Sequence, residues 1–535
     1  MLTKKPLNEV FGSPKQILFL FVIVLLGTAL RLYCFQGFWG TDDAEYARLA
    51  HAMTKGSFCD FVRANYLENF NGPAHLPFRM ALIFPLSLLF SFFGVSELVL
   101  VIYPLTISIL SILLVYFSGR LLFGVKAGLI ASAIWAVLPI NIQYSTSFRP
   151  DIPVTFYASL GVIILITMMK SETKSKFLLF LSGSFAGLLF GISWLCKGTV
   201  LYLVPFCIVL LIFSVRKNRK AGLSLWAGVA TLSLGVIVIE MIAYYYLRGD
   251  FLFRFHEIER SYIQTKSYLF FEGSRFGWPV GSSHLKAILK RLLIEGPKFI
   301  FLNDQYLYLP LFGIIAGVHS LYWKNKEFLI PFLWMIIPAL MYNFSSHSLS
   351  SYTPLVLYHS YLLPMVFPAA LLTSGFLAKL LFSDAEHMHT AISRERIFWG
   401  FVLTIFIIGV GGYKTFREIR GERRIKSIYE TKTVSSLLKA SDPIYTDPLT
   451  GKCLEFFWHY PEKMNVTNFE NMKASEIPPK CFVLLDRARL EYLKINVGMW
   501  LTKDYGYHTP GFLDHPPQSW KIIWKNRNAI LYRTD

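Results

Sequence analysis

Residues 16–35 read QILFLFVIVLLGTALRLYCF, and residues 40–50, shortly after them, read GTDDAEYARLA. The first stretch is apolar over about 20 residues, the length of helix that crosses a bilayer core of about 30 Å. The second stretch places two neighbouring carboxylates, Asp42 and Asp43, just beyond that helix. Carboxylates are costly inside lipid and are accommodated in a wet cleft at its edge. The two stretches together predict a membrane helix that leads into a polar, acidic site.

The rest of the chain repeats the apolar pattern of this first stretch. Of its 535 residues, 54% are hydrophobic and 16% are charged, whereas soluble domains carry about 25% charged residues. The mean hydropathy is +0.45. Apolar runs of about 20 residues recur, without the alternation that marks the strands of a membrane barrel. We therefore predict an α-helical polytopic membrane protein.

The formal net charge of +19 fits a membrane better than a nucleic acid. Its basic residues concentrate in short loops beside the apolar runs. The positive-inside rule and anionic lipid both account for basic residues at such places. We expect membrane lipids as partners and no nucleic acid.

The number of spans depends on residues 79–94, which are apolar but short and contain Pro85. If they do not cross, the basic loops, such as residues 216–220, all fall on one side, which the positive-inside rule makes cytoplasmic. We therefore predict that they form a re-entrant or interfacial hairpin. Lys4, Lys5 and Lys15 then place the N-terminus in the cytoplasm. The eleven predicted spans are about 16–35, 98–118, 127–147, 152–169, 177–195, 198–214, 222–247, 299–321, 327–344, 361–382 and 397–412.

The composition changes near the end of the last apolar run. Residues 1–413 are predicted to form a membrane domain with external loops at about 36–97 and 248–298. Residues 414–535 are predicted to form a basic linker helix and a small extracytoplasmic α/β domain. Within that domain, residues 443–445, 481–485 and 520–532 have strand composition, and KNRN at 525–528 separates two β-rich runs as in a hairpin.

The chain shows none of the common cofactor motifs. It contains no HExxH motif and no glycine-rich phosphate loop after a strand, and its six cysteines form no CxxC pair. Cys453 and Cys481 lie in the same predicted domain, and either a disulfide or two free thiols fits the sequence. We expect that no cofactor is required. The residues able to bind a divalent cation are Asp42, Asp43, His75 and Asp151.

The unusual polar residues all fall on the external side of the predicted topology, near the ends of spans. They are Asp42, Asp43, His75, Arg149, Asp151, Lys197, His256, Glu257, Arg260 and Tyr361. A carboxylate there is able to take a proton from an acceptor hydroxyl. Lysine and arginine hold a phosphate and offset its charge as it leaves. The shared sidedness predicts an enzyme that uses a lipid-linked phosphate donor.

Each candidate also has a purely structural explanation. Asp42 and Asp43 suit the start of a helix, where aspartate accepts backbone N–H bonds. Arg149 and Asp151 suit a local ion pair, and Lys197 suits a side chain that reaches to the interface. The structural alternatives for the remaining candidates are packing at the interface for His75 and His256 and an aromatic belt for Tyr361.

Several short motifs, in this order, resemble those of the GT-C glycosyltransferases that use polyprenyl-phosphate sugars. The branch is that of the protein O-mannosyltransferases and of the lipid A aminoarabinose transferase. The resemblance covers roughly residues 16–380. The motifs are TDDAEYA at 41–47, HLP at 75–77, FGVSE at 93–97, RPDIP at 149–153, CKG at 196–198 and YLLP at 361–364, with Pro368 after it.

The resemblance implies transfer of a sugar from a polyprenyl-phosphate carrier to a glycolipid, lipid A or protein, at the outer face of a bacterial inner membrane. It implies that Asp42 is the general base, with Asp43 supporting or replacing it, and that Lys197 and Arg260 contact the donor. The chain departs from the family at Asp43, where glutamate is usual, and at Glu257, where histidine is usual. Because no second carboxylate is placed as a nucleophile, we expect inversion at the sugar carbon. The alternatives are a transporter or flippase for an anionic lipid-linked sugar, and a non-catalytic scaffold.

Overall fold

The computed structural model describes residues 13–64, 78–171, 175–264, 284–322, 324–346, 352, 354–355, 357–382, 391–419, 424–469, 472–487, 511–513 and 515–535. The chain separates into two compact units, each built from several segments. The helical unit comprises Met1–Phe35, Tyr103–Phe251 and Gly281–Arg420. The mixed unit comprises Gln36–Ile102, Leu252–Val280 and Gly421–Asp535. The predicted boundary at residue 413 divides the chain into two consecutive parts. The compact units are not consecutive, because the residues of the first external loop belong to the same unit as the C-terminal residues.

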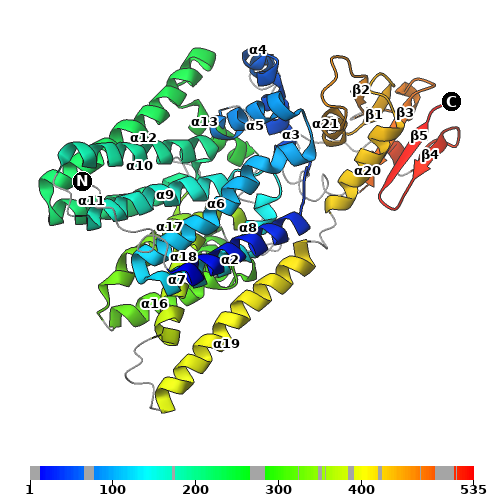
Figure 1. The fold of residues 1–535 in the computed structure, drawn as a ribbon. Helices are drawn as coiled ribbons and strands as arrows, with labels where there is room; N and C mark the ends of the chain where they lie inside the picture. Colours follow the sequence, from blue (N-terminus) through cyan, green and yellow to red (C-terminus); the bar gives the residue numbers. More distant parts are fainter. Residues whose placement is uncertain are drawn as a thin grey trace. The chain divides into compact units, whose positions relative to one another are not determined.

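The described residues contain nine helices that are long and apolar enough to cross a membrane, or eleven if each of two bent pairs is one span. The unbroken helices are α2 (Pro14–Tyr33), α6 (Glu97–Phe123), α9 (Asp151–Lys170), α10 (Lys176–Cys196), α11 (Val204–Lys217, preceded by η2, Gly198–Leu203), α12 (Arg219–Arg248), α17 (Leu329–Phe344, preceded by η6, Lys326–Phe328), α18 (Leu363–Phe382, preceded by η7, His359–Leu362) and α19 (Ala391–Lys414, followed by η9, Thr415–Ile419). They are drawn in Figure 1. The predicted fold class, a polytopic helical protein of about eleven spans, is confirmed.

Two predicted spans are broken helices. The first is α7 (Val125–Ala136) with α8 (Pro139–Ser145), bent by 59°. The second bends by 110° between residues 306 and 309. It consists of α14 (His284–Lys290), η4 (Arg291–Glu295), α15 (Gly296–Phe301), η5 (Asp304–Tyr306) and α16 (Leu309–Tyr322). In membrane proteins such interruptions occur where protein or water, not lipid, surrounds the backbone.

A buried arginine explains how the first break is tolerated. Helix α7 ends at Ala136, so its last carbonyls have no donor within the helix. The carbonyl of Ala136 accepts from Arg31 of α2 at 3.0 Å, and Pro139, which has no N–H, occupies the first position of α8. Arg31 is fully buried and also donates to the Ser108 hydroxyl at 2.8 Å. An arginine in the first span therefore satisfies a backbone group that the break releases.

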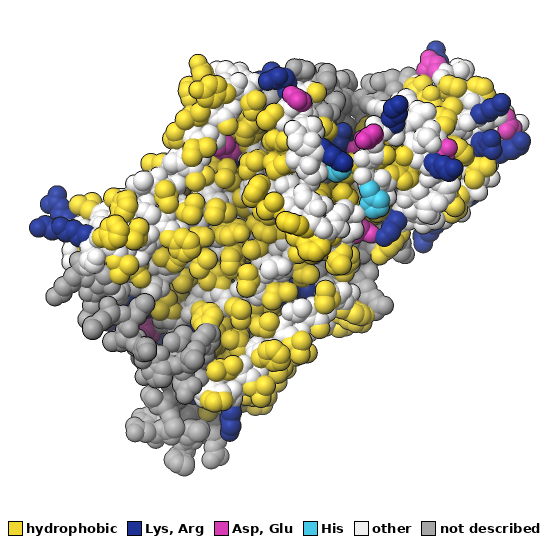
Figure 2. All heavy atoms as spheres, turned by 45° about the horizontal axis from the view of Figure 1, so that its top comes forward, with side chains coloured by type: hydrophobic (Ala, Val, Ile, Leu, Met, Phe, Trp, Pro, Cys, Tyr) yellow, Lys and Arg dark blue, Asp and Glu magenta, His cyan; other side chains and the backbone are white. Residues whose placement is uncertain are grey.

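Small residues set the closest helix packing in the helical unit. Gly183, Gly187 and Gly191 recur every four residues along α10, the spacing that lets two membrane helices approach. A Cβ atom at Gly187 would lie 2.3 Å from the carbonyl oxygen of Val229 on α12. Only glycine permits this contact. On the outer surface of the helices, hydrophobic side chains cover most of the face that Figure 2 shows, as expected of helices in lipid.

Residues 80–93 form one short helix, α5 (Met80–Phe93), and not the predicted hairpin. It contains Pro85 and ends at Gly94, whose φ of +74° suits glycine. With 14 residues it is too short for a span, in line with the predicted count. It packs against α3 (Asp42–Thr54), and α4 (Phe58–Val62) follows α3. The acidic stretch is thus part of a small helical layer in the mixed unit.

The C-terminal residues form a five-stranded mixed sheet in the order β2-β1-β3-β5-β4. Its strands are β1 (Ile444–Thr446), β2 (Val466–Asn468), β3 (Phe482–Asp486), β4 (Lys521–Lys525) and β5 (Ala529–Arg533). The strands β1–β2 and β1–β3 are parallel, and β5 is antiparallel to both β3 and β4. The predicted strands and the hairpin at 525–528 are therefore present, while β2 was not predicted. The other elements of the unit are α13 (Phe253–Gln264), α20 (Arg424–Leu437), α21 (Pro448–Phe457), η10 (Ala474–Glu476) and η12 (Gly511–Leu513).

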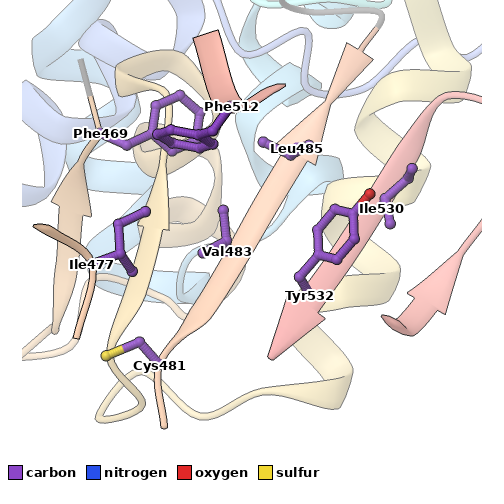
Figure 3. Packing of buried hydrophobic residues seen from close by; sticks show 8 residues of the cluster. All are labelled: Phe469, Ile477, Cys481, Val483, Leu485, Phe512, Ile530 and Tyr532. Atoms are coloured by element: carbon purple, nitrogen blue, oxygen red, sulfur yellow. The ribbon is translucent and has the colours of Figure 1, made fainter. Parts of the chain in front are cut away.

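Both faces of the central strands are buried. Val483 and Leu485 of β3 point into one cluster (Figure 3), whereas Leu484 packs into a second cluster on the other face. This follows from the two-residue repeat of a strand. Cys453 and Cys481 are both buried free thiols, so the disulfide alternative is wrong.

The predicted basic linker is not one continuous helix in the described residues. Lys414 is the last residue of α19, and its side chain is buried and forms an ion pair with Asp304. A π-helical turn follows at Thr415–Ile419, and α20 begins at Arg424. The first of the predicted interfacial cations is therefore an internal residue of the helical unit.

Candidate functional site

The acidic stretch enters helix α3 through a tight loop, and Asp43 holds that loop together. Asp43 is completely buried. One carboxylate oxygen accepts from the backbone N–H of Trp39 and, at 3.3 Å, from that of Gly40. The other oxygen accepts from the backbone N–H of Thr41 at 2.7 Å. Asp43 is thus bonded to its own loop and does not cap the helix as the structural alternative predicts, because its donors precede α3 and the N-cap residue is Thr41, which makes no capping side-chain bond.

Asp42 has a different environment although it is the next residue. It is the first residue of α3, and its side chain is exposed. A helix N-terminus carries a partial positive charge, which favours a carboxylate in its ionised form. An ionised, solvent-accessible carboxylate is able to accept a proton from a bound hydroxyl. The structure therefore distinguishes the two neighbouring acids by burial.

A second polar contact braces α3 from the side of α5. The guanidinium of Arg79, the residue before α5, donates to the hydroxyl of Tyr46. Both side chains are buried. The arginine two residues after the HLP motif is therefore bound to the tyrosine of the TDDAEYA motif.

In the helical unit, three further motifs meet at the ends of helices. Asp151 is the first residue of α9, and Lys197 directly follows α10. The ammonium of Lys197 lies 2.6 Å from a carboxylate oxygen of Asp151. It also lies 4.0 Å from the ring centroid of Tyr361, a cation–π distance. The RPDIP, CKG and YLLP motifs thus form one cluster.

This cluster replaces the predicted local pairing of Asp151 with Arg149. Asp151 is buried, and it takes Lys197 as its ion-pair partner. Arg149 lies two residues earlier and is half-buried.

The remaining candidates are only partly described. His256 is exposed and Glu257 is buried, side by side on α13. Arg260 belongs to the same helix, but its side chain lies outside the described residues. His75 lies wholly outside them.

Two groups of functional candidates escaped the sequence analysis. Asn303 contacts the ring of His359 at 2.8 Å, and the hydroxyl of Tyr306 donates to the His359 carbonyl at 2.7 Å. The second group is a set of ion pairs between α3 and α21, described below. Glu45 belongs to the TDDAEYA motif, but its partner and the other members stand in no motif, so only long-range proximity identifies these contacts.

No metal centre is evident in the part of the chain that the structure describes. Its residues contain no group of three or more His, Cys, Asp or Glu side chains able to hold an ion. Three of the four predicted ligands are described, and they take backbone, solvent or lysine as neighbours.

Comparisons with known proteins agree with this architecture. A family model described as dolichyl-phosphate-mannose-protein mannosyltransferase matches residues 80–242. A curated relative, dolichyl-phosphooligosaccharide-protein glycotransferase 2 of Archaeoglobus fulgidus, is 29% identical over 258 residues. That match covers 45% of this chain and 41% of the relative, so the chain matches about two fifths of the relative's length.

Solved structures show the same fold over nearly the whole chain. ArnT from Cupriavidus metallidurans has a TM-score of 0.53 at 13% identity and covers 96% of this chain and 97% of its own. The oligosaccharyltransferase AglB from Archaeoglobus fulgidus has a TM-score of 0.56 at 14% identity, covering 91% of this chain and 71% of its own. ArnT has been solved bound to undecaprenyl phosphate, and the archaeal enzyme with Zn and sulfate. The predicted resemblance to the GT-C glycosyltransferases is confirmed, and the chain has their fold.

Proposed function

We propose that this protein is a membrane glycosyltransferase that moves a sugar from a polyprenyl-phosphate carrier to a hydroxyl or phosphate acceptor. The acceptor classes are a glycolipid, lipid A or a protein. The fold shared with ArnT and AglB supports this class of reaction, because those structures contain undecaprenyl phosphate and dolichol-phosphate. The observation that carries the choice of base is the exposure of Asp42 beside the buried, loop-bound Asp43.

The proposed step is a direct displacement. Asp42 takes the proton of an acceptor hydroxyl as its oxygen attacks the anomeric carbon. The bond from that carbon to the phosphate oxygen breaks, and the polyprenyl phosphate leaves with the bonding electrons. Attack opposite the leaving group inverts the configuration. A phosphate acceptor is already ionised and attacks without losing a proton.

Cations are needed for the leaving phosphate, because negative charge grows on it in the transition state. We assign this role to Lys197, Arg149 and Arg260, with His75, His256, Glu257, Asp151 and Tyr361 contributing to the donor site. Lys197 is held in place by Asp151 and the ring of Tyr361. A fixed ammonium is worth more to a developing charge than a mobile one, because no reorganisation is required.

The second candidate function is transport or flipping of an anionic lipid-linked sugar. Transporters place their charged residues near the middle of the bilayer, at interrupted helices. Here Asp151 and Lys197 stand at the ends of α9 and α10. This placement favours the transferase.

We also propose a bacterial inner membrane as the location, with a cytoplasmic N-terminus and an extracytoplasmic C-terminal domain. The reaction as written needs no metal. A divalent cation would assist by neutralising the phosphate, and a zinc complex of the archaeal relative supports testing for one. Addition of a chelator to the assay below tests this point.

The test uses purified protein in liposomes with radiolabelled undecaprenyl-phosphate sugars and a crude envelope acceptor. We expect wild type to move label to the acceptor and Asp42→Asn to lose transfer about 100-fold to 10,000-fold while still binding donor. Asp60→Asn, which changes an exposed acid on α4, is the matched control and is expected to behave as wild type. Transfer by Asp42→Asn at the wild-type rate contradicts the assigned base. Movement of intact donor across the bilayer without transfer favours the transporter.

A further inference from the structure

Helix α21 contacts α3, also in the mixed unit, through two partly buried ion pairs. The ammonium of Lys452 pairs with a carboxylate oxygen of Glu45. The guanidinium of Arg48 lies 2.8 Å from a carboxylate oxygen of Glu455. Each helix supplies one acid and one base three residues apart, in opposite order. Residues three apart share a helix face, so the two faces are complementary in charge.

These four side chains are largely shielded from solvent, so the two ion pairs are expected to contribute to the stability of the contact. Glu45, Arg48, Lys452 and Glu455 have side-chain exposures of 8%, 15%, 19% and 21%. Exposed ion pairs contribute about 0–1 kcal/mol, whereas removing one partner of a buried pair leaves a charge without compensation. Burial raises the pKa of Glu455, and the charges of Arg48 and Lys452 oppose that shift. The carboxylate therefore depends on its two cations.

Two aromatic contacts lie on either side of the two ion pairs, one before Glu45 and one after Arg48 along the chain. Upstream of α3, the ring of Phe38 stacks on Phe456 of α21, with centroids 4.1 Å apart and planes within 5°. Further along α3, the ring of His51 stacks on Tyr460 at 4.8 Å. Contacts at residues 38, 45, 48 and 51 determine both the rotation of α3 and its position along its axis. A single contact would leave either the rotation of α3 or its position along its axis undetermined.

The position of Asp42 follows from that of α3. Asp42 lies one turn before Glu45 on α3, so the contacts that fix α3 also fix the backbone of Asp42. Phe38 belongs to the loop that Asp43 closes. We propose that α21 is a positioning element for Asp42, with Lys452, Glu455 and Phe456 as its positioning residues. The proposal rests on the function proposed for Asp42.

The experiment reverses the two charges singly and then together. Glu45→Lys and Lys452→Glu each place like charges together, whereas the double swap restores the ion pair between the helices. Hydrogen exchange of residues 40–50 is followed by mass spectrometry, and sugar transfer is measured in parallel. We expect each single variant to speed exchange at least 10-fold and to lower kcat 10-fold to 100-fold with little change in the KM for the donor. We expect the swap to recover a large part of both quantities but not all of it, because the new lysine then lies beside Arg48, which is 3.8 Å from Glu45 in wild type.

Two further variants keep the test decisive. Lys452→Gln removes the charge without repulsion and covers the case in which a reversal does not fold. It is expected to give smaller changes of the same sign. Lys463→Glu, a reversal at an exposed lysine of the same unit, is the control for net charge.

The outcomes separate the two proposals. Unchanged exchange in Glu45→Lys, Lys452→Glu and Lys452→Gln overturns the positioning role, whatever the activity. Faster exchange with undiminished transfer also overturns it. Absence of transfer in wild type overturns the proposed function instead. Loss of kcat in the singles and its recovery in the swap support the role, because a merely structural pair would not move kcat separately from KM.

Discussion

The substitution Asp43→Asn tests whether this residue organises the loop before α3. The carboxylate accepts four hydrogen bonds, two at each oxygen: Trp39 N–H and Gly40 N–H at one, Thr41 N–H and the Thr41 hydroxyl at the other. Asparagine keeps one oxygen and turns the other position into an NH₂ group, which does not accept. With the NH₂ group toward Trp39 and Gly40, two backbone N–H groups face a donor; with it toward Thr41, one does, because the Thr41 hydroxyl is able to rotate and accept.

The expected magnitude follows from those lost acceptors. A buried donor left without a partner costs about 1–3 kcal/mol. One or two such losses amount to about 1–4 kcal/mol. Since about 1.4 kcal/mol corresponds to a factor of ten, the loop amides are expected to open roughly 5-fold to 1,000-fold more often.

The assay is hydrogen exchange of peptides covering residues 36–45 in detergent micelles. Asp42→Asn is the neighbouring control, and because its side chain is exposed it is expected to change local stability by less than about 1 kcal/mol. Exchange in Asp43→Asn within threefold of wild type would refute the reasoning. So would a larger effect of Asp42→Asn on the loop amides than of Asp43→Asn.

Three further predictions concern stability and are read from thermal unfolding of the purified protein. Gly187→Ala brings a Cβ atom 2.3 Å from a carbonyl oxygen of α12 and is expected to lower the unfolding midpoint. The control, Gly235→Ala, meets nothing within 4 Å and is expected to leave the midpoint unchanged; equal midpoints for the two variants contradict the packing. Lys197→Met leaves the buried Asp151 unpaired and is expected to cost about 3–5 kcal/mol, and adding Asp151→Asn is expected to recover most of it. Because burial raises the pKa of Glu455 above 4.5, the folded state holds that proton more tightly, so its contribution to stability is lost as pH rises above 4.5. Wild type is therefore expected to lose stability relative to Glu455→Gln as pH rises above 4.5, and parallel profiles contradict this.

The difference between Asp42 and Asp43 bears on how the motif is interpreted. Adjacent acids in a sequence suggest a shared role, and a capping role and a catalytic role both fit them. In the structure Asp43 is buried and bonded to the loop before α3, whereas Asp42 is exposed and neither residue caps the helix. The loop-holding acid and the proposed base are thus separate residues.

The sequence alone determined the features that depend on local chemistry. The spans follow from apolar runs of bilayer length, and eleven are recovered with the two bent pairs counted as one each. Strands β3, β4 and β5 follow from composition and the turn residues between the last two. These properties are set by neighbours along the chain, so no knowledge of packing is needed.

Only the tertiary structure decided which charges are buried and which residues they pair with. Lys197 and Asp151 are 46 residues apart, and Lys452 and Glu45 are 407 apart. The sequence shows that such charges exist, but a charged side chain has many potential partners and its burial depends on elements that pack around it. Asp43 is buried, and Asp42 is not, because the loop of Trp39, Gly40 and Thr41 closes around one carboxylate and leaves the next one in solvent.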